Sequence, residues 1–391
     1  MRLLFVADGR SPIALNWISY FVQAGHEVHL ASTFPCQPEL RLSSLEVIPV
    51  AFGGVAGMAA QPAAGSGSGR LRRLLPVGLR TAIRQWIGPL SLSGAARRFA
   101  QVAARIRPDL VHAMRIPYEG MLAALGSDPG VPLLVSVWGN DFTLHAPSNP
   151  LLARYTRLAL RRASALHADC QRDILLAPMW GFEASKPAVV LPGGGGVQLD
   201  LFYPLADGDS IANQAPLVVN PRGFRAYVEN KAFFQAIPWV LEAHPLARFA
   251  CPAMAGEAQA LRWVEQTNLS AQVELLPRLT RQQMADLFRR AQVAVSPTTH
   301  DGTPNTLLEA IACGCFPIAG DLESLREWIV PGQNGLLVDP RSPQALAQAM
   351  ITALSDSRLR LEAREQNTRL VAERADYRRV MEKAEAFYRQ L

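Results

Sequence analysis

The segment that most limits what this chain can fold into is residues 293–320. Its two apolar ends, 293–295 and 316–319, are typical of short buried strands. Thr303 and Pro304 lie between them and form a typical helix start, in which a hydroxyl cap is followed by proline at the first helical position. A strand, a helix and a second strand in this order predict a parallel sheet with helices on its faces, and therefore an α/β fold.

Two carboxylates bracket the start of the expected helix. Asp301 lies in the loop before it, and Glu309 lies two turns into it. Open α/β sheets bind ligands at the carboxyl ends of their strands, and the amides and dipole of a helix N-terminus favour a phosphate there. The amides of Thr306 and Leu307 are in place to donate hydrogen bonds to such a phosphate. The alternative interpretation is an ordinary strand, loop and helix with a solvated Asp-Gly turn.

The chain opens with a second unit of the same kind. Residues 3–7 predict a strand, an apolar stripe at helical spacing covers 13–22, and 28–31 predict the next strand. Gly9 follows the first strand, where the absence of a side chain would let the backbone approach a diphosphate. A turn glycine without a ligand is equally compatible with this position.

The length of the chain and a run of glycines near its middle indicate two domains. A chain of 391 residues suits two domains of ordinary size. The glycines at 193–196 cannot continue a helix or a strand without a cost, and a new strand is expected at 216–220. We therefore expect a first domain over residues 1–195 and a second over residues 196–371.

The stretch from residue 47 to residue 108 is basic and contains no acidic residue. Between 71 and 87, apolar residues share the sequence with arginines, which is typical of a basic amphipathic helix at an anionic membrane surface. We expect such contact through residues 70–107; a core-facing helix with a solvated basic face is the alternative. Few aromatic residues are interleaved with the basic ones, which argues against nucleic-acid binding. The arginines are Arg70, Arg72, Arg73, Arg80, Arg84, Arg97, Arg98, Arg105 and Arg107.

Cysteine usage and the start of the chain favour a cytoplasmic protein. The five cysteines are odd in number and scattered, which is typical of a reducing compartment. Cys313 and Cys315 form the one close pair, and we expect them to be small core residues rather than metal ligands. The chain reaches Asp8 too early for a signal peptide, and no apolar run has the length of a membrane span. We expect a cytoplasmic location, with peripheral attachment to the inner membrane face through the basic stretch.

Residues 290–340 resemble the signature of the retaining glycosyltransferases of family 4, which have the GT-B fold. The family pattern is Glu, seven residues, Glu, an Ala/Gly-rich turn and a strand, and the segment at 334–340 is also similar. The resemblance implies that Glu309 holds the ribose hydroxyls of a nucleotide sugar. Asp301 takes the place of the first Glu, which faces the donor sugar, although its side chain is shorter by one methylene. The family fold implies two Rossmann-like domains facing each other across a cleft, with the last helix, at 372–391, crossing back to the first domain.

The resemblance also indicates which cations are expected to bind the donor diphosphate. The family places an Arg directly after the strand that here ends at Asn220, and a Lys about six residues further on. Arg222 matches the strand-end position, whereas the interval from Arg225 to Lys231 matches the spacing. The choice among the three stays open, and we expect Arg222 and Lys231 at the diphosphate.

For the acceptor side, the residues from Trp138 to Asp141 resemble the His-Gly-x-Asp motif of the family. Asp141 is expected beside the acceptor, with a capping Asp in a turn as the alternative. Trp138 stands where His is common, and an indole cannot act as a base. His112, at the end of an expected strand, resembles a family position near the acceptor, and a packed histidine is as compatible.

Together, these features imply a retaining hexosyltransferase that moves a sugar from a nucleotide-sugar donor to an acceptor hydroxyl on a glycan or on a lipid-linked, membrane-proximal acceptor. We expect no metal and no cofactor, because cations and helix amides can neutralise the departing diphosphate. Two alternatives stay open: a sugar-nucleotide epimerase, which shares the GT-B architecture, and a non-catalytic sugar-nucleotide binding protein.

Overall fold

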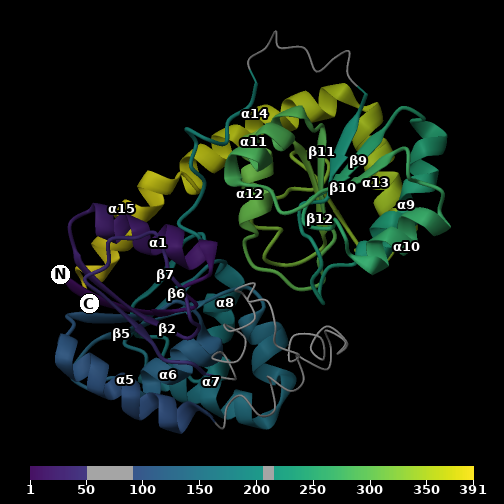
Figure 1. The fold of residues 1–391 in the computed structure, drawn as a ribbon. Coiled ribbons are helices and arrows are strands. Elements are labelled where there is room, and N and C mark those ends of the chain that lie inside the picture. Colours follow the sequence, from purple (N-terminus) through teal and green to yellow (C-terminus); the bar gives the residue numbers. More distant parts are fainter. Residues whose placement is uncertain (51–90, 206–214) are drawn as a thin grey trace. The chain divides into compact units, whose positions relative to one another are not determined.

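The structure is a computed structural model, and it describes residues 1–50, 91–205 and 215–391. The chain divides into two compact units (Figure 1). Unit 1 contains residues 1–195 together with 381–391, and unit 2 contains residues 196–380. Each unit is built on a parallel sheet with helices on its two faces, which confirms the expected α/β class.

The sheet of unit 1 has the strand order β3-β2-β1-β4-β5-β6-β7, with every neighbouring pair parallel. The order runs outward from β1 in one direction and then, from β4, in the other, which is the doubly wound arrangement of Rossmann-like folds. The strands are β1 (Arg2–Ala7), β2 (Glu27–Ser32), β3 (Ser44–Val47), β4 (Leu110–Ala113), β5 (Leu133–Val137), β6 (Ala165–Ala168) and β7 (Ala188–Val190).

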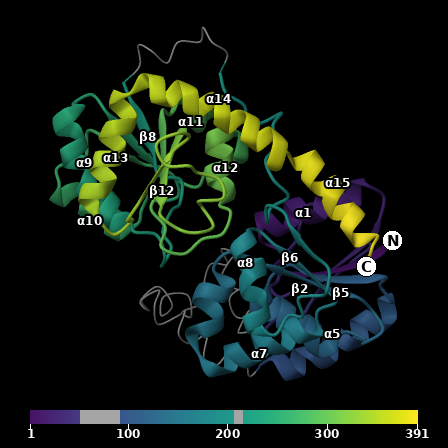
Figure 2. The same cartoon turned by 180° about the vertical axis from the view of Figure 1, so that it is seen from behind.

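Helices cover both faces of this sheet (Figures 1 and 2). Residues of α5, α6 and α7 form one apolar cluster with the strands, and α1 packs on the other face together with the end of the chain. Central strands such as β1 and β5 are buried on both sides and therefore read as apolar runs rather than as alternating ones. The helices are α1 (Pro12–Gln23), α5 (Leu92–Ile106), α6 (Met121–Gly126), α7 (Pro150–Arg162), α8 (Gln171–Leu176) and α15 (Tyr377–Tyr388), with short turns η2 (Ile116–Gly120), η3 (Asp141–His145), η4 (Ala146–Ser148) and η5 (Ala177–Trp180).

The last helix, α15, is fixed to unit 1 by Tyr388. The ring of this tyrosine is fully buried and stacks on Phe21 with ring centroids 4.5 Å apart. Its hydroxyl accepts a hydrogen bond from the indole nitrogen of Trp17 at 2.8 Å and lies against Nδ1 of His112. The chain therefore returns to its first domain at the C-terminus, as the GT-B resemblance implied.

The hydroxyl of Tyr388 starts a chain of buried hydrogen bonds through the centre of unit 1. His112 Nε2 lies 2.7 Å from Ser136 Oγ, Ser136 Oγ lies 2.8 Å from His167 Nδ1, and His167 Nε2 lies 2.9 Å from the carbonyl oxygen of Leu191. A carbonyl only accepts, so His167 carries its proton on Nε2 and accepts from Ser136 on Nδ1. The remaining directions follow: His112 donates to Ser136, and Tyr388 donates to His112. Both histidines are neutral, and burial lowers the pKa of each.

The sheet of unit 2 has the same winding, with the order β10-β9-β8-β11-β12-β13 and parallel neighbours throughout. Residues of α9, α10 and α13 pack on one face, and residues of α11, α12 and α14 on the other (Figure 1). The strands are β8 (Leu217–Val219), β9 (Arg248–Cys251), β10 (Val273–Leu275), β11 (Val293–Ser296), β12 (Phe316–Gly320) and β13 (Leu336–Val338). The helices are α9 (Asn230–Ala243), α10 (Ala258–Gln266), α11 (Arg281–Arg290), α12 (Asn305–Ala312), α13 (Pro343–Ser355) and α14 (Ser357–Arg374).

One of the glycines that suggested a domain boundary is required by close packing. Gly196 has φ of +91°, and a Cβ there would lie 2.2 Å from the carbonyl oxygen of Ala375. The next residue, Val197, donates its amide to that same carbonyl at 2.7 Å. A side chain at Gly196 would therefore both strain the backbone and break this contact.

Most of the basic stretch, including the apolar residues at 71–87, lies outside the described residues. Its last part is α5, whose apolar face is buried in unit 1 and whose Arg97, Arg98 and Arg105 are exposed. This part corresponds to a core-facing helix with a solvated basic face. Within the described ranges, no helix has the length and apolar character needed to cross a membrane.

The neutral histidines predict a loss of stability in mild acid. The pKa of His167 is about 4 in the folded protein, below its ordinary value of 6.5. The unfolded chain therefore binds a proton at higher pH than the folded chain does, so this contribution is complete above pH 6.5 and is lost as the pH falls towards 4. We expect about 2 kcal/mol of unfolding free energy to be lost from this residue between pH 7 and pH 5.

The measurement is urea unfolding at pH 7, 6 and 5 for the wild type and for His167→Gln. The variant should show a smaller decrease with falling pH, because glutamine does not titrate there. His244→Gln, at a partly exposed position of unit 2, is the matched control. An identical pH dependence in the wild type and His167→Gln would contradict the neutral, buried state of His167.

Candidate active site

The winding of unit 2 locates its ligand-binding edge. The strand order changes direction between β8 and β11, and loops leave the carboxyl ends of both strands at this point. Ligands of open α/β sheets bind at such a position. The loop after β8 is held in shape by two asparagines, since Asn220 donates to Asn230 at 3.0 Å and Asn230 donates to the carbonyl of Gly223 at 2.9 Å.

Three of the predicted donor-site residues meet at this edge. Arg222, from the loop after β8, donates to the Asp301 carboxylate at 2.6 Å and to Thr306 Oγ1 at 3.1 Å. The side chains of Arg222 and Asp301 are only 9% and 15% exposed. Burial raises the pKa of Asp301, and the charge of Arg222 opposes that rise. The two loops are thus joined by a largely buried cation and carboxylate at the start of α12.

The start of α12 differs from the prediction. The helix begins at Asn305, Pro304 occupies the cap position with an extended backbone, and no side chain caps the helix. The expected cap by Thr303 is wrong, because its hydroxyl instead accepts the indole N–H of Trp328 at 3.0 Å. The amide of Leu307 donates to the carbonyl of Pro304 at 3.0 Å, so it is already engaged. Within the described residues, the amide of Thr306 has no such acceptor and is the better phosphate donor.

Glu309 lies on the same face of α12 as Thr306, because residues three apart on a helix are neighbours. Its side chain is 16% exposed, and Oε1 lies 3.6 Å from a guanidinium nitrogen of Arg281 on α11. Burial raises the pKa of Glu309 to about 7, with Arg281 opposing the rise. The structure therefore places the Arg222–Asp301 pair and the Glu309 carboxylate along one side of one helix.

The other two candidate cations are more exposed. Arg225 lies close enough to Asp301 to help lower the pKa of that carboxyl, and it also donates to the hydroxyl of Tyr227 at 3.4 Å. Lys231 is in the first turn of α9 and is exposed, with no hydrogen bond or ion pair to any residue that the structure describes. Arg222 and Arg225 are therefore the two cations that the structure brings to Asp301, and the role of Lys231 stays a prediction.

In unit 1, Asp141 follows β5 and is almost completely buried. It accepts from Nε of Arg115 at 2.8 Å and from the backbone amide of Trp138 at 3.1 Å. Arg115 follows β4 and also donates to the side chain of Asn140 at 2.7 Å. This arrangement fixes the loop after β5, so the capping role that was the alternative for Asp141 is present in the structure. Its predicted contact with an acceptor stays a prediction.

Sequence reasoning missed an acidic cluster after β6. The ligand atoms of Asp169, Cys170 and Asp173 lie within 4.8 Å of one another, a spacing that could hold a metal ion. However, Arg172 already pairs with Asp173 at 2.8 Å, and burial raises the pKa of both the Cys170 thiol and the Asp173 carboxyl. A protonated thiol, next to a carboxylate that is already paired with an arginine, does not favour a metal. The position directly after a strand was the available sequence signal; the contact of Asp169 with the amide of Gly139, at 3.3 Å, is visible only in the structure.

The structure places His112 and Gly9 in tightly packed surroundings. His112 is 1% exposed and belongs to the hydrogen-bond chain of Tyr388, so it could influence an acceptor only through other residues. The amide of Gly9 donates to Ser32 Oγ at 3.0 Å, and a Cβ on Gly9 would lie 2.3 Å from Sγ of Cys36. Local packing accounts for the glycine, and its role at a diphosphate stays a prediction.

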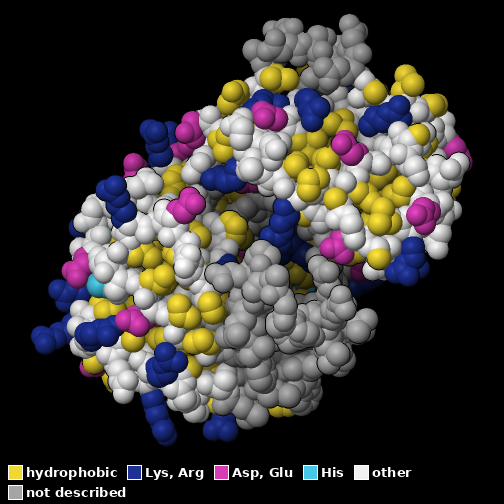
Figure 3. Space-filling model, in the orientation of Figure 1, with side chains coloured by type: hydrophobic (Ala, Val, Ile, Leu, Met, Phe, Trp, Pro, Cys, Tyr) yellow, Lys and Arg dark blue, Asp and Glu magenta, His cyan; other side chains and the backbone are white. Residues whose placement is uncertain are grey.

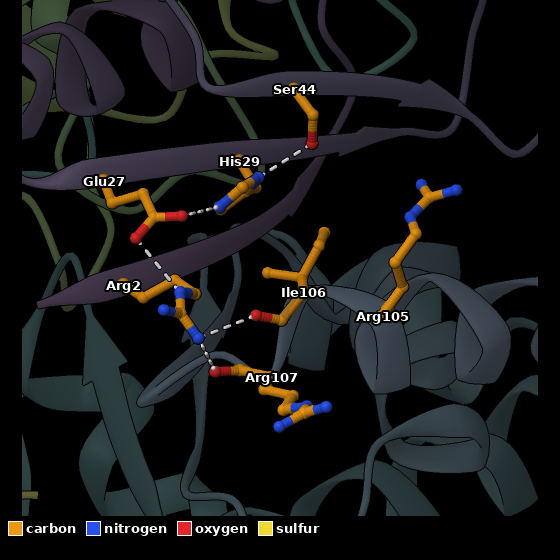
Figure 4. Close-up of a pocket in the computed structure, with 7 residues that line it drawn as sticks. All are labelled: Arg2, Glu27, His29, Ser44, Arg105, Ile106 and Arg107. Carbon is orange, nitrogen blue, oxygen red and sulfur yellow. Dashed lines mark hydrogen bonds and ion pairs between the residues drawn. The ribbon is translucent and has the colours of Figure 1, made fainter.

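A hollow of about 530 Å³ lies at the opposite, amino-terminal edge of the sheet of unit 1 (Figure 4). Arg2 is fully engaged there: it pairs with Glu27 at 3.0 Å and donates to the carbonyls of Ile106 and Arg107. These carbonyls end α5, where the helix dipole favours cations. Arg2 thus compensates a helix C-terminus and a carboxylate, and its charge is not available to an anionic ligand. The lining residues are Arg2, Glu27, His29, Ser44, Arg105, Ile106 and Arg107.

Two doubly wound sheets, one of them with a buried cation and carboxylates at its switch point, define the class of Rossmann-like α/β proteins, whose ligands bind at the switch point. Two family models match the chain. The glycosyl transferase 4-like domain matches residues 9–193, and the glycosyl transferases group 1 model matches residues 253–370. The first match lies in unit 1 and the second in unit 2.

Known proteins agree with these matches. The D-inositol 3-phosphate glycosyltransferase of Xylanimonas cellulosilytica is 27% identical over 196 residues, which is about half of each chain (46% of both). The phosphatidyl-myo-inositol mannosyltransferase of Mycobacterium tuberculosis is 28% identical over 293 residues, or 63% of this chain and 74% of that protein.

Solved structures show the same fold over the whole chain. Sucrose-phosphate synthase from Thermosynechococcus elongatus superposes with a TM-score of 0.75 at 16% identity, covering 100% of this chain and 99% of that one. HepE of Anabaena, solved in complex with UDP, gives 0.73 at 15% identity, with 100% of both chains covered. The two models together match residues 9–193 and 253–370, so the chain belongs to the glycosyl transferases, and its fold is the GT-B fold of these solved structures.

The buried ion pair of Asp141 predicts a structural penalty for its removal. In Asp141→Asn, Arg115 loses its charge partner inside unit 1. We expect a loss of about 3–5 kcal/mol of unfolding free energy, measured by urea titration. Asp128→Asn, at an exposed position of the same unit, is the matched control and should change stability little. Wild-type stability of Asp141→Asn would show that the ion pair does not hold the loop.

Proposed function

We propose that this glycosyltransferase is a hexosyltransferase that keeps the anomeric configuration of its donor sugar. The observation that carries the proposal is the arrangement along α12: Arg222, Asp301, Thr306 and Glu309 converge at the switch point of unit 2. A cation, a free helix amide and two carboxylates are the groups that a nucleoside diphosphate sugar requires.

Each group has a distinct task in this proposal. Arg222 and the amide of Thr306 neutralise the diphosphate, which becomes the leaving group. Glu309 accepts the two ribose hydroxyls, since a carboxylate is an acceptor with two oxygens. Asp301, held by Arg222, presents its carboxylate to the donor sugar, where positive charge develops in the transition state. Lys231 adds a second cation if the diphosphate extends towards α9.

The reaction needs no protein nucleophile in this scheme. The departing phosphate takes the proton of the attacking acceptor hydroxyl, on the face that the leaving group vacates, and so the configuration is retained. Neither metal nor cofactor is part of the proposal, because Arg222 and Arg225 both lie beside Asp301 and supply positive charge. Asp141 orders the loop on the acceptor side, and His112 contributes to that side only as a positioning residue.

Relatives support a sugar nucleotide as donor and a lipid-linked or membrane-proximal acceptor. HepE of Anabaena has been solved with UDP-glucose, and the mycobacterial relative is a phosphatidyl-myo-inositol mannosyltransferase. We propose that the enzyme works at the cytoplasmic face of a membrane. The exposed arginines of α5 support this, although Arg and Lys side chains are spread over the visible face of the molecule rather than gathered in one patch (Figure 3).

The donor site is tested by Glu309→Ala. The variant lacks the acceptor for the two ribose hydroxyls, so the binding free energy of the donor should weaken by about 1.5–3 kcal/mol. This corresponds to a decrease in affinity of roughly 10- to 150-fold. A thermal-shift screen of UDP-, GDP- and ADP-sugars selects the donor, and titration calorimetry gives the affinity. Glu323→Ala, an exposed residue of the same unit, is the control. If Glu309→Ala binds the donor with unchanged affinity, Glu309 does not bind the ribose and this part of the proposal is wrong.

The same screen separates the alternative functions. Incubation of the selected donor alone followed by NMR detects an epimer, which a transferase does not form. With acceptors present, the anomeric configuration of the product tests retention, and chelation of divalent metals should leave the rate unchanged. Donor binding without turnover across acceptors would favour a non-catalytic binding protein.

Membrane contact predicts salt-sensitive binding to anionic vesicles. Each arginine near such a surface contributes about 1 kcal/mol, so Arg97→Glu with Arg98→Glu should weaken sedimentation with phosphatidylserine vesicles at low salt by more than tenfold. Arg358→Glu with Arg360→Glu, on α14 of unit 2, is the charge-matched control. If the wild type does not sediment with anionic vesicles at low salt, the membrane proposal is wrong.

A further inference from the structure

We propose that Arg281 is a positioning residue of the donor site, whose guanidinium holds the Glu309 carboxylate in place to accept the ribose hydroxyls of a nucleotide. The inference rests on the proposed function, which assigns Glu309 to the ribose. Sequence patterns do not single out Arg281, because it is one of many arginines and belongs to none of the motifs of the donor site.

The position of Arg281 is fixed from two sides. Its backbone opens α11, where Thr280 and Gln283 form a reciprocal capping box that holds the first turn. Its guanidinium carbon lies 5.4 Å from the ring centroid of Phe202, a fully buried residue, and its Nη2 lies 3.6 Å from Oε1 of Glu309. The cation is therefore held between an aromatic face and the carboxylate.

The dipole of α11 does not favour a cation at the position of Arg281. A helix dipole favours cations in the last turn and disfavours them in the first. The last turn of α11 follows this rule with Arg289 and Arg290, and the first turn has no acidic residue. Residues that break such a local rule are expected where function requires them. The favourable interaction of Arg281 is its ion pair with Glu309 on the neighbouring helix α12.

The carboxylate of Glu309 needs this partner because it is largely buried. Within the described residues, Arg281 is its one ion-pair partner, and burial raises its pKa to about 7. Cys313, at the end of α12, is close enough to Glu309 for that carboxylate to raise the pKa of its thiol, and Asp286 and Arg289 of α11 act on the same thiol. From α14, Arg364 lies over Gly314 instead, and β11 and β12 carry no titratable side chain.

Loss of Arg281 should therefore change the charge of Glu309 at neutral pH. An opposite charge at this distance lowers the pKa of an acid by at least about one unit. Without it, the ionised fraction at pH 7 falls from about one half to about one tenth. A protonated carboxyl has one oxygen committed as a donor, so it cannot accept both ribose hydroxyls.

The experiment is titration calorimetry of UDP, GDP and ADP at pH 6, 7, 8 and 9, using the tightest binder for all variants. We expect wild-type affinity to rise with a midpoint near pH 7, and Arg281→Ala to move that midpoint upward by about one unit with about fivefold weaker binding at pH 7. Arg281→Lys should restore most of the affinity. Arg290→Ala, which removes the same charge from an exposed position of the same helix, should match the wild type.

A double variant separates positioning from general damage. In Glu309→Gln the affinity should be low and independent of pH, and adding Arg281→Ala should weaken binding no further. In turnover assays, Arg281→Ala should raise the KM for the donor and leave kcat nearly unchanged. If the wild type binds none of the three nucleotides, the proposed function fails and the inference fails with it. If the wild type binds and Glu309→Gln weakens binding, but Arg281→Ala follows the wild-type pH profile, only the role of Arg281 is overturned.

Discussion

The ion pair between Arg222 and Asp301 is the interaction on which the candidate site depends. It joins the loops that leave β8 and β11, and it does so where the strand order of unit 2 changes direction. Burial of either charge without the other would carry a large desolvation penalty, so each side chain holds the other in place. The Nε of Arg222 is buried and has no acceptor among the described residues. The pair is thus held firmly, while one of its buried donors is left over, which is compatible with the proposed contact of Arg222 with a diphosphate.

The two units use their strand ends differently, although their sheets are wound alike. In unit 1 the acids after β5 and β6 are neutralised by arginines from neighbouring loops, as Arg115 does for Asp141 and Arg172 for Asp173. In unit 2 the carboxylate of Glu309 has Arg281, at 3.6 Å, as its one ion-pair partner among the described residues, and its pKa is raised to about 7. Unit 1 therefore has a stabilised loop framework, whereas unit 2 has unused acceptor capacity, which is the property of a binding site.

The sequence predicted the fold class and the strand–helix–strand unit around Asp301, because apolar periodicity and glycines report directly on these features. The return of the C-terminal helix to unit 1 was implied only by the family resemblance. The sequence did not predict that the indole N–H of Trp328 would donate a hydrogen bond to the hydroxyl of Thr303, since that contact joins residues 25 apart in the sequence. Arg115, Arg172 and Arg281 escaped notice for a related reason. In an arginine-rich chain, only the tertiary structure shows which guanidinium meets a carboxylate.

The hydrogen-bond chain behind Tyr388 has a further consequence, which follows from its direction. Every member donates towards Leu191, and the final acceptor is a peptide carbonyl that holds no exchangeable proton. Such an array cannot conduct protons between the ends of unit 1. It instead aligns the dipoles of two imidazoles and two hydroxyls. This static polarisation lasts as long as α15 stays packed on unit 1 through Tyr388.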